Sequence, residues 1–237
     1  MIKLFRNIRK NLLAQGKTTK YLKYAIGEII LVVIGILIAL SINNWNDIRK
    51  NQKYEQDILF LINQNLDNDS IQLTDRLLKA KEAIELTNRL VAQVATENYG
   101  DSLNFWMGKI ITFERFTSQS SAFEVLKSKG IETISDNDLQ LALISYYDED
   151  LSGVYQALND VEQSFKVDWF PVIKAEFSDF KWRAYCVPTD SKAFFQKAST
   201  LTFFNFYKDN RYGSVHNIEL ALEKISKIKN LSKKNSR

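Results

Sequence analysis

The chain contains few residues that could support chemistry based on histidine or cysteine. His216 and Cys186 are its single histidine and single cysteine, and they lie 30 positions apart. A metal site needs several such ligands, or carboxylates, clustered at fixed spacing. The sequence also contains no HExxH, CxxC or GxSxG motif and no glycine-rich phosphate loop. We therefore predict no catalytic residue, no metal site and no cofactor, and a protein that is not an enzyme.

The individual titratable residues have simpler interpretations. We expect His216 to be a surface or capping histidine near the start of a helix. Cys186 lies among aromatic residues such as Trp182 and Tyr185, so we expect it to be buried and to act as a small hydrophobic side chain. The acidic run at 148–150 fits a solvated helix face better than a pair of catalytic carboxylates.

Aromatic residues are concentrated in the second half of the chain, because most of the 29 Phe, Tyr and Trp residues lie between positions 99 and 212. Large rings pack irregular ends of helical bundles well, and this is one interpretation. The other is an exposed hydrophobic groove that receives a peptide, a lipid or a partner protein. Its residues would be Trp169, Phe170, Phe180 and Trp182, and their exposure distinguishes the two interpretations.

An uncharged stretch near the N-terminus predicts a membrane-spanning helix. Between Glu28 and Asp47 lie 18 uncharged residues, IILVVIGILIALSINNWN, which begin with a dense aliphatic run. Tyr24 and Trp45 flank the span as interfacial aromatic residues do. A helix from Tyr24 to Trp45 rises about 32 Å, close to one hydrocarbon core. We therefore predict a transmembrane helix over 24–46 and a lipid bilayer as the first partner.

Charge predicts the orientation of this span. Seven Lys and Arg residues precede Glu28 without any acidic residue, which places the N-terminus in the cytoplasm. The residues after Glu28 carry 25 basic and 27 acidic side chains, so the net charge of +4 reflects the leader. The basic pI therefore does not indicate nucleic-acid binding. The sequence predicts a bacterial cytoplasmic (inner) membrane protein whose main domain is periplasmic.

Two features of the first 46 residues leave alternatives open. The triplet Ala39-Leu40-Ser41 follows an apolar stretch and a basic leader, as a cleaved signal peptide requires. The long leader and Trp45 favour a retained anchor instead. Residues 1–23 fit either an amphipathic helix on an anionic inner leaflet or a basic tail without fixed structure.

Hydrophobic spacing after the span predicts helices. Eight glycines and two prolines in 237 residues leave few breaks for a sheet protein. Apolar residues step by three or four over 59–98, and similar patterns follow at 121–130, 135–177 and 212–231. Ser121 with Glu124 is a capping-box pattern for the second of these. We predict an all-α fold, in which the transmembrane helix precedes an antiparallel bundle of four to five helices in an extracytoplasmic domain at 47–231. A polar tail follows at 232–237.

Two blocks of sequence carry a resemblance, KYLKYAIGEIILVVIGILIALSINNWND and SAFEVLKSKGIETISDNDLQLALISYYDED. They resemble a family of uncharacterised single-pass membrane proteins of flavobacteria and their relatives, whose span ends in INNWN. The resemblance implies a domain of unknown function and no activity. Two Asp-Ser-aliphatic triplets, containing Ser70 and Ser102, also resemble the short O-glycosylation acceptor motif of these bacteria, although three-residue motifs also recur by chance.

Small residues in the span suggest an association between spans. Gly35 and Ala39 lie four apart, as in small-xxx-small pairs that let two backbones approach closely. Glu28 would snorkel to the cytoplasmic boundary or bond across such an interface. The alternative is a helix that floats in lipid with incidental glycines. The sequence thus predicts either a homodimer or a pairing with another membrane protein.

Two functional hypotheses follow from these features. In the first, the chain is a membrane-anchored extracytoplasmic interaction or sensory module of unknown ligand. In the second, it is a structural subunit of a bacterial envelope complex. A stoichiometric partner that is recovered in detergent favours the second, and stabilisation by a ligand favours the first.

Overall fold

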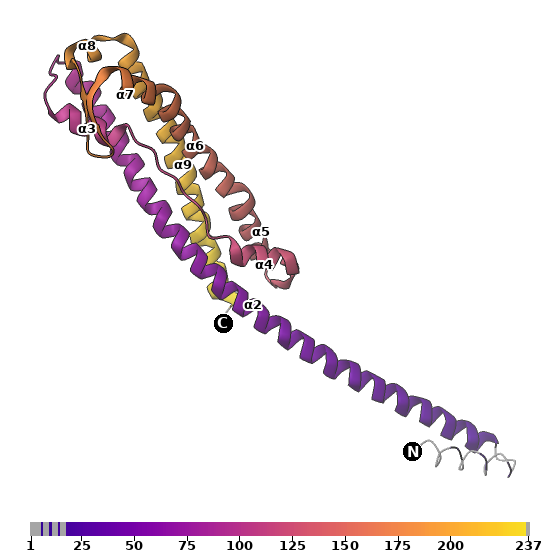
Figure 1. Ribbon diagram of the computed structural model, residues 1–237. Helices are drawn as coiled ribbons and strands as arrows, with labels where there is room; N and C mark the ends of the chain where they lie inside the picture. Colours follow the sequence, from indigo (N-terminus) through magenta and orange to yellow (C-terminus); the bar gives the residue numbers. More distant parts are fainter. Residues whose placement is uncertain (1–5, 7–9, 11–13, 15–17, 236–237) are drawn as a thin grey trace. The chain divides into compact units, whose positions relative to one another are not determined.

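The computed structural model describes residues 6, 10, 14 and 18–235 (Figure 1). The chain forms two compact units, Met1–Tyr54 and Glu55–Arg237. The predicted leader at 1–23 and the polar tail therefore lie partly outside the described residues. In chain order the elements are α2 (Thr18–Val94), α3 (Ser102–Ile110), α4 (Ser121–Lys129), the 3₁₀ turn Ile131–Thr133, α5 (Asn137–Ile144), the π-helical turn Ser145–Asp150, α6 (Leu151–Ser164), the π-helical turn Phe165–Trp169, α7 (Phe170–Glu176), β1 (Phe177–Lys181), β2 (Tyr185–Pro188), α8 (Ser191–Gln196) and α9 (Ala198–Asn235).

In the first unit, residues 18–54 are the N-terminal part of α2. The helix contains an 18-residue window with a mean hydropathy of 2.8, and none of this window is buried. By length and composition the helix is long and apolar enough to cross a membrane. The predicted long apolar helix is therefore present.

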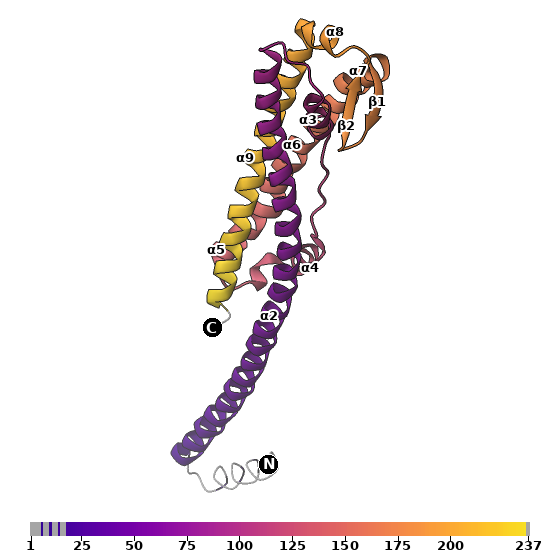
Figure 2. The same ribbon diagram turned by 90° about the vertical axis from the view of Figure 1, so that its left-hand side faces the viewer.

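In the second unit, residues 55–94 of α2 lie antiparallel to α9. Lys81 on α2 pairs with Glu219 on α9 at 2.6 Å. Further along α2, Asn88 accepts a hydrogen bond of 3.1 Å from Lys208. A later residue of α2 thus contacts an earlier residue of α9, as expected for antiparallel helices. The two helices lie side by side in both views (Figures 1 and 2).

An extended segment, residues 111–120, carries the chain back along α2. Ten extended residues reach about 33 Å, so the segment returns without a helix. Arg76 on α2 donates to the backbone oxygen of Arg115 at 3.0 Å, and Asp69, earlier on α2, binds Ser118 and Gln119. Burial alternates along the segment, with Thr112, Glu114 and Phe116 inward. The sequence had predicted no element here.

The helix predicted over 135–177 is present as one continuous run from Asn137 to Glu176, but two of its turns are π-helical. The first π turn buries the neighbouring tyrosines Tyr146 and Tyr147, which an α-helical turn would point 100° apart. The run is capped by Asp136, whose carboxylate accepts from the backbone N–H of Leu139 at 3.0 Å. It packs along α9, where Asn210 donates to Ser164 at 2.8 Å.

Several predicted helix boundaries differ from the structure. The second predicted helix is present as α4, but its N-cap is Ser120 and no side chain caps it, so the capping box at Ser121 is wrong. α9 begins at Ala198 rather than near Tyr212. The reason is that its first turns carry closely spaced aromatic residues, which obscure the 3.6-residue period.

The all-α prediction omits one antiparallel hairpin, β1–β2. Its turn contains Arg183 at φ 61°, a left-handed conformation that is uncommon outside glycine. The hairpin approaches α3 so closely that a Cβ at Gly108 would lie 2.3 Å from the backbone nitrogen of Tyr185. Figure 2 shows β2 beside α3. Glycine at position 108 therefore allows the two backbones to meet.

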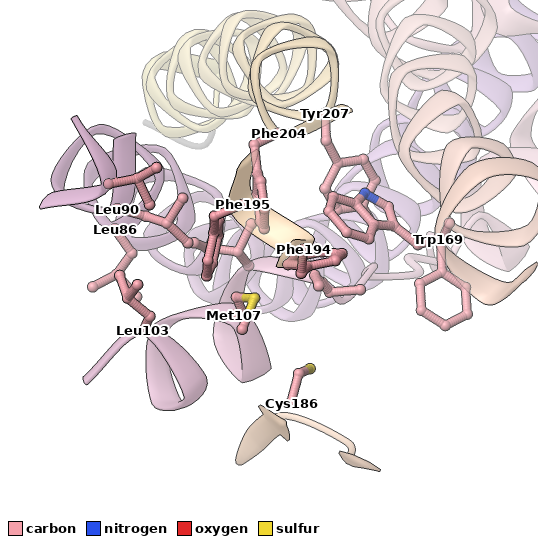
Figure 3. Close-up of a cluster of buried hydrophobic side chains, with 14 of the residues drawn as sticks. Leu86, Leu90, Leu103, Met107, Trp169, Cys186, Phe194, Phe195, Phe204 and Tyr207 are labelled. Atoms are coloured by element: carbon pink, nitrogen blue, oxygen red, sulfur yellow. The ribbon is translucent and has the colours of Figure 1, made fainter. Parts of the chain in front are cut away.

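The hydrophobic core of the second unit is aromatic at this end. Trp169 is 1 % exposed, and its ring lies 4.6 Å from Phe204 and 6.2 Å from Tyr207. Figure 3 shows these rings beside Phe194 and Phe195 of α8, with Met107 of α3 below them. The structure thus confirms that much of the aromatic concentration serves packing.

Candidate functional site

The four aromatic residues predicted to line a groove do not share one environment. Trp169 belongs to the core and is 1 % exposed, so it cannot contribute to an exposed groove. Phe170 and Trp182 are exposed, and Phe180 is half-buried. The ring of Trp182 contacts that of Phe180 at 6.3 Å, and Phe165 lies 5.1 Å away. Phe170, Phe180 and Trp182 therefore belong to an aromatic cluster at the surface, and Trp169 is not part of it.

The other residues considered from the sequence are placed as follows. Cys186 is buried, and burial raises the pKa of its thiol to about 12, as expected of a small hydrophobic side chain. His216 is exposed in the middle of α9, so the surface interpretation is correct and the helix-start position is wrong. Ser70 is half-buried within α2, whereas Ser102 is exposed at the first residue of α3. O-glycosylation of either serine stays a prediction, and Ser102 is the more accessible of the two.

The span residues lie on α2 within the first unit. Tyr24, Gly35, Ala39 and Trp45 are exposed, and Glu28 is half-buried. A Cβ at Gly35 would meet nothing within 4 Å. Their proposed roles at a membrane interface or in a helix pair stay predictions.

Asp69 forms the most buried polar cluster between α2 and the extended segment. Its side chain is fully buried and accepts hydrogen bonds from three groups. These are the hydroxyl of Ser118, the backbone N–H of Gln119 at 2.9 Å and the hydroxyl of Tyr146 at 2.8 Å. Burial and the nearby Asp69 carboxylate raise the pKa of Tyr146 well above its ordinary value, so the phenol stays a donor. This cluster joins three segments of the chain and has no cation in it.

Glu114 forms a second polar cluster of different character. Its side chain is nearly buried, and its oxygens face three cations from two elements. Arg183 of the hairpin turn donates to Glu114 Oε1 at 2.6 Å, and Arg76 and Lys79 of α2 each lie 3.7 Å from Oε2. One carboxylate is thus shared by three positive charges.

A hollow of about 130 Å³ lies beside Glu114, and we call it the cationic hollow. Its lining residues come from four elements and are Lys79, Glu82, Lys109, Thr112, Glu114 and Arg183. Lys109, in the last turn of α3, is paired with Glu82 of α2. The lysine and arginine side chains are between 37 % and 51 % exposed, so their charged groups are open to solvent.

Arg211 of α9 adds a buried positive charge behind the hollow. It is 3 % exposed, and one of its terminal nitrogens donates to the backbone oxygens of Ile110 and Thr112 at 2.6 and 2.7 Å. Ile110 is the last residue of α3, and a cation is favoured at this end of the helix by the helix dipole. Tyr207 lies against the guanidinium, 4.8 Å from ring centroid to carbon, and donates to the same Thr112 oxygen. Burial lowers the pKa of Arg211, yet arginine remains protonated in proteins.

A second hollow, of about 190 Å³, is lined by residues of the extended segment and of α6. Glu162 of α6 forms part of its wall and accepts hydrogen bonds from Arg115 at 2.9 and 2.6 Å. Lys166 approaches the same carboxylate at 2.7 Å. Hydrogen bonds from Arg115 and Lys166 lower the pKa of Glu162 to about 2. The exposed Tyr155 stacks on Phe116 in this hollow at 5.9 Å.

Sequence reasoning did not select the residues of the cationic hollow as a site. Lys79, Lys109, Glu114 and Arg183 span more than 100 positions and come together only in the fold. Glu114 points inward from the extended segment, and so does a threonine of the same segment. Because these inward residues are polar, the hydropathy pattern does not reveal the alternation of buried and exposed residues. Within the described residues, no group of three or more His, Cys, Asp or Glu side chains is placed to hold a metal ion.

Comparison with known proteins identifies a family. The Family of unknown function (DUF6090) matches residues 28–166, which is more than half of the 237 residues. The matched region includes Asp69 and Glu114 and ends before Arg183. No curated protein and no solved structure matches the chain. The resemblance to a family without known function is confirmed, and the chain belongs to the DUF6090 family of unknown function.

Proposed function

We propose that this protein is a membrane-anchored interaction or sensory module without enzymatic activity, whose folded unit lies outside the cytoplasm. One observation carries the proposal. The N-terminal part of α2 contains an 18-residue apolar window that is entirely unburied, whereas the second unit has a core of its own. An unburied helix of this hydropathy is stable in a lipid bilayer.

The orientation rests on charge. Seven Lys and Arg residues precede the span without an acidic residue before Glu28, and such an excess favours the cytoplasmic side. We therefore place the protein in a bacterial cytoplasmic (inner) membrane with its N-terminus inside and its helical bundle in the periplasm. Reporter fusions test this placement. A periplasmic reporter active at the C-terminus and silent at residue 20 supports it, and the reverse pattern contradicts it.

The interaction role rests on the surface of the second unit. The cationic hollow presents solvent-accessible charges from three elements, and the aromatic cluster exposes Phe170 and Trp182. By contrast, the residue types most used in catalysis are poorly placed, because Cys186 is buried with a raised pKa and His216 is isolated on an exposed helix face. These features favour binding over catalysis.

One observation favours the second candidate function, a structural subunit of an envelope complex. Phe60, Ile71 and Leu78 of α2 are between 63 % and 70 % exposed. Their spacing of 11 and 7 residues places them on one face of the helix. A permanent partner that covers this face would remove three large apolar side chains from water.

Mild-detergent purification of the full chain from its host distinguishes the two roles. A partner recovered in equal amount, and lost in Ile71→Ser but not in Lys109→Gln, favours the structural subunit. A partner recovered in smaller amount, and lost in Lys109→Gln but not in Ile71→Ser, favours the interaction module. A chain that purifies without any partner from the native membrane contradicts both roles.

The span offers a separate test of self-association. Gly35 and Ala39 lie four apart on α2, and replacing both with Ile would prevent close approach of two backbones. We expect a lower dimer signal in a membrane two-hybrid assay at unchanged expression. Replacing Ile34 and Ile38 with Leu is the matched control, since it alters the neighbouring face without adding bulk. An unaltered signal in the Gly35 and Ala39 variant would contradict a homodimer held by the span.

A further inference from the structure

We propose that the cationic hollow binds a doubly charged phosphate group. The inference goes beyond the proposed function, because it concerns the chemistry of one site and holds whether or not a protein docks on the second unit. It rests on charge balance, on the geometry of the donors and on the way in which the fold holds Arg183.

Three cations and two carboxylates line the hollow, and two more cations and one more carboxylate flank it. The cations are Arg76, Lys79, Lys109, Arg183 and Arg211, and the carboxylates are Asp75, Glu82 and Glu114. Two positive charges are therefore uncompensated, and a dianion matches them. Because Arg211 is buried, its share of the field is screened less by water than that of the exposed lysines.

The donors also suit a phosphate group. Arg183 uses one nitrogen for Glu114, and its side chain, which is 46 % exposed, has further N–H groups in the planar fork of the guanidinium. Arg binds phosphate oxygens through this fork, whereas Lys79 and Lys109 act as mobile point charges. The hollow of about 130 Å³ admits a group of several atoms, since one water molecule occupies about 30 Å³.

The fold holds Arg183 in an uncommon conformation. Its φ of 61° lies in the left-handed region, which costs a non-glycine residue free energy. The turn is fixed from behind, because the backbone of Ala184 and Tyr185 lies against Gly108 of α3. Gly108 also precedes Lys109 directly, so the same contact sets the positions of two cations of the hollow.

Isothermal titration of the full chain in dodecyl maltoside, a detergent without phosphate, tests the site. Orthophosphate is added up to about 10 mM at constant ionic strength, a range that saturates a site of millimolar Kd. Lys109→Gln removes one cation. Arg183→Asn removes another and keeps the turn, because asparagine tolerates the left-handed region. We expect saturable binding of one phosphate, and an increase in Kd of about tenfold in each variant.

Lys81→Gln is the matched control. Lys81 is on the same helix as Lys79, is 51 % exposed like Lys109, and pairs with Glu219 away from the hollow. The Kd of the Lys81→Gln variant for orthophosphate is expected to stay within about twofold of that of the parent protein, since Lys81 contributes only a distant, screened charge. Equal weakening in Lys81→Gln and Lys109→Gln would mean a diffuse charge effect and would overturn the site, as would the absence of saturable heat.

Two further ligands identify the chemistry. Malonate, a dianion that carries two carboxylates, is expected to bind more weakly than orthophosphate, and equal binding would overturn the assignment to phosphate. Glycerol 3-phosphate distinguishes the sources of the group. Tighter binding than orthophosphate indicates a phosphate ester, and weaker binding indicates the free ion. Circular dichroism of each variant confirms that the helical content is retained.

Discussion

Asp69 and Glu114 both lie where the extended segment meets α2, yet the protein surrounds them in opposite ways. Asp69 is fully buried and is bound by two hydroxyls and one backbone N–H. Glu114 is 9 % exposed and is surrounded by Arg76, Lys79 and Arg183. Neutral, directional donors fix a carboxylate in one place. Long side chains with charged ends can bind one anion in place of another. The surroundings of Asp69 therefore suit a structural role, and those of Glu114 suit ligand binding.

The largest expected effect is that of Asp69→Ala. The change leaves the buried hydroxyl of Tyr146 and the N–H of Gln119 without their acceptor. Each unpaired buried group costs about 1–3 kcal/mol, so we expect the free energy of unfolding to fall by about 3 kcal/mol. The measurement is urea unfolding of the full chain in detergent, followed by tryptophan fluorescence, to which the buried Trp169 contributes. Asp67→Ala is the control, because Asp67 is exposed and pairs with Lys229, and it should change stability by less than about 1 kcal/mol.

Equal losses in the Asp69 and Asp67 variants would contradict the architectural role of Asp69. A loss confined to the Asp69 variant would support it, and Tyr146→Phe should then reproduce only part of the loss. That variant removes one donor to Asp69 and leaves the other two in place.

The second prediction concerns the hairpin that holds Arg183 beside Glu114. In Gly108→Ala the new Cβ would lie 2.3 Å from the backbone nitrogen of Tyr185, so the hairpin must move. We expect a loss of about 2 kcal/mol in the free energy of unfolding, as in overpacked cores, and loss of orthophosphate binding. Gly213→Ala is the matched control, because a Cβ there meets nothing within 4 Å. It should stabilise α9 by up to about 1 kcal/mol. A Gly108→Ala protein as stable as the parent would show that the hairpin does not depend on this contact.

Only some parts of the fold could be predicted from the sequence. Elements with a regular period were found, such as the apolar part of α2 and the helical run that ends at Glu176. The pattern there is a local property of the side chains. The two π turns were missed, because a 3.6-residue period cannot reveal one extra residue in a turn.

The hairpin and the extended segment were missed for different reasons. Hairpin turns are usually marked by Gly or Asn at positive φ, and here the position is occupied by Arg183. The backbone of the next two residues, Ala184 and Tyr185, packs against Gly108, and no local pattern records a contact between residues so far apart in the sequence. The same holds for the candidate site, since Glu114 and Arg183 meet through tertiary structure alone.

The third prediction tests the difference between the two carboxylates directly. Glu114→Gln removes the anion that three cations share, and we expect a loss of less than about 1 kcal/mol, because those cations are partly solvated. Orthophosphate should bind this variant several times more tightly, since a competing charge has gone. Asp69→Asn should instead lower stability by about 2 kcal/mol and leave the phosphate Kd unchanged. Weaker phosphate binding in Glu114→Gln would mean that Glu114 orients the cations rather than competing with the ligand.

The smallest expected effect concerns pH and Glu162, a carboxylate held by cations like Glu114. Its pKa in the folded protein is lowered to about 2 by Arg115 and Lys166, whereas an unfolded glutamate titrates near 4.3. A depressed folded pKa gives stability that is fully present above the unfolded pKa and is lost as the pH falls toward the folded pKa. The window is therefore about pH 4.5 to 2. Because Arg115 is 69 % exposed, solvent screening should limit the effect to about 1 kcal/mol or less.

The measurement is the urea midpoint at pH 5 and at pH 2.5, for the parent protein and for Glu162→Gln. The glutamine side chain of this variant cannot take up a proton as the pH falls, so the variant should lose less stability across the window than the parent does. Other carboxylates also titrate in this range, and the comparison between the two proteins removes their common contribution. Glu219→Gln is the control, because Glu219 is 50 % exposed and makes one ion pair with Lys81. If the Glu162 and Glu219 variants respond to pH alike, the two hydrogen-bonded cations at Glu162 contribute no more than an ordinary surface ion pair.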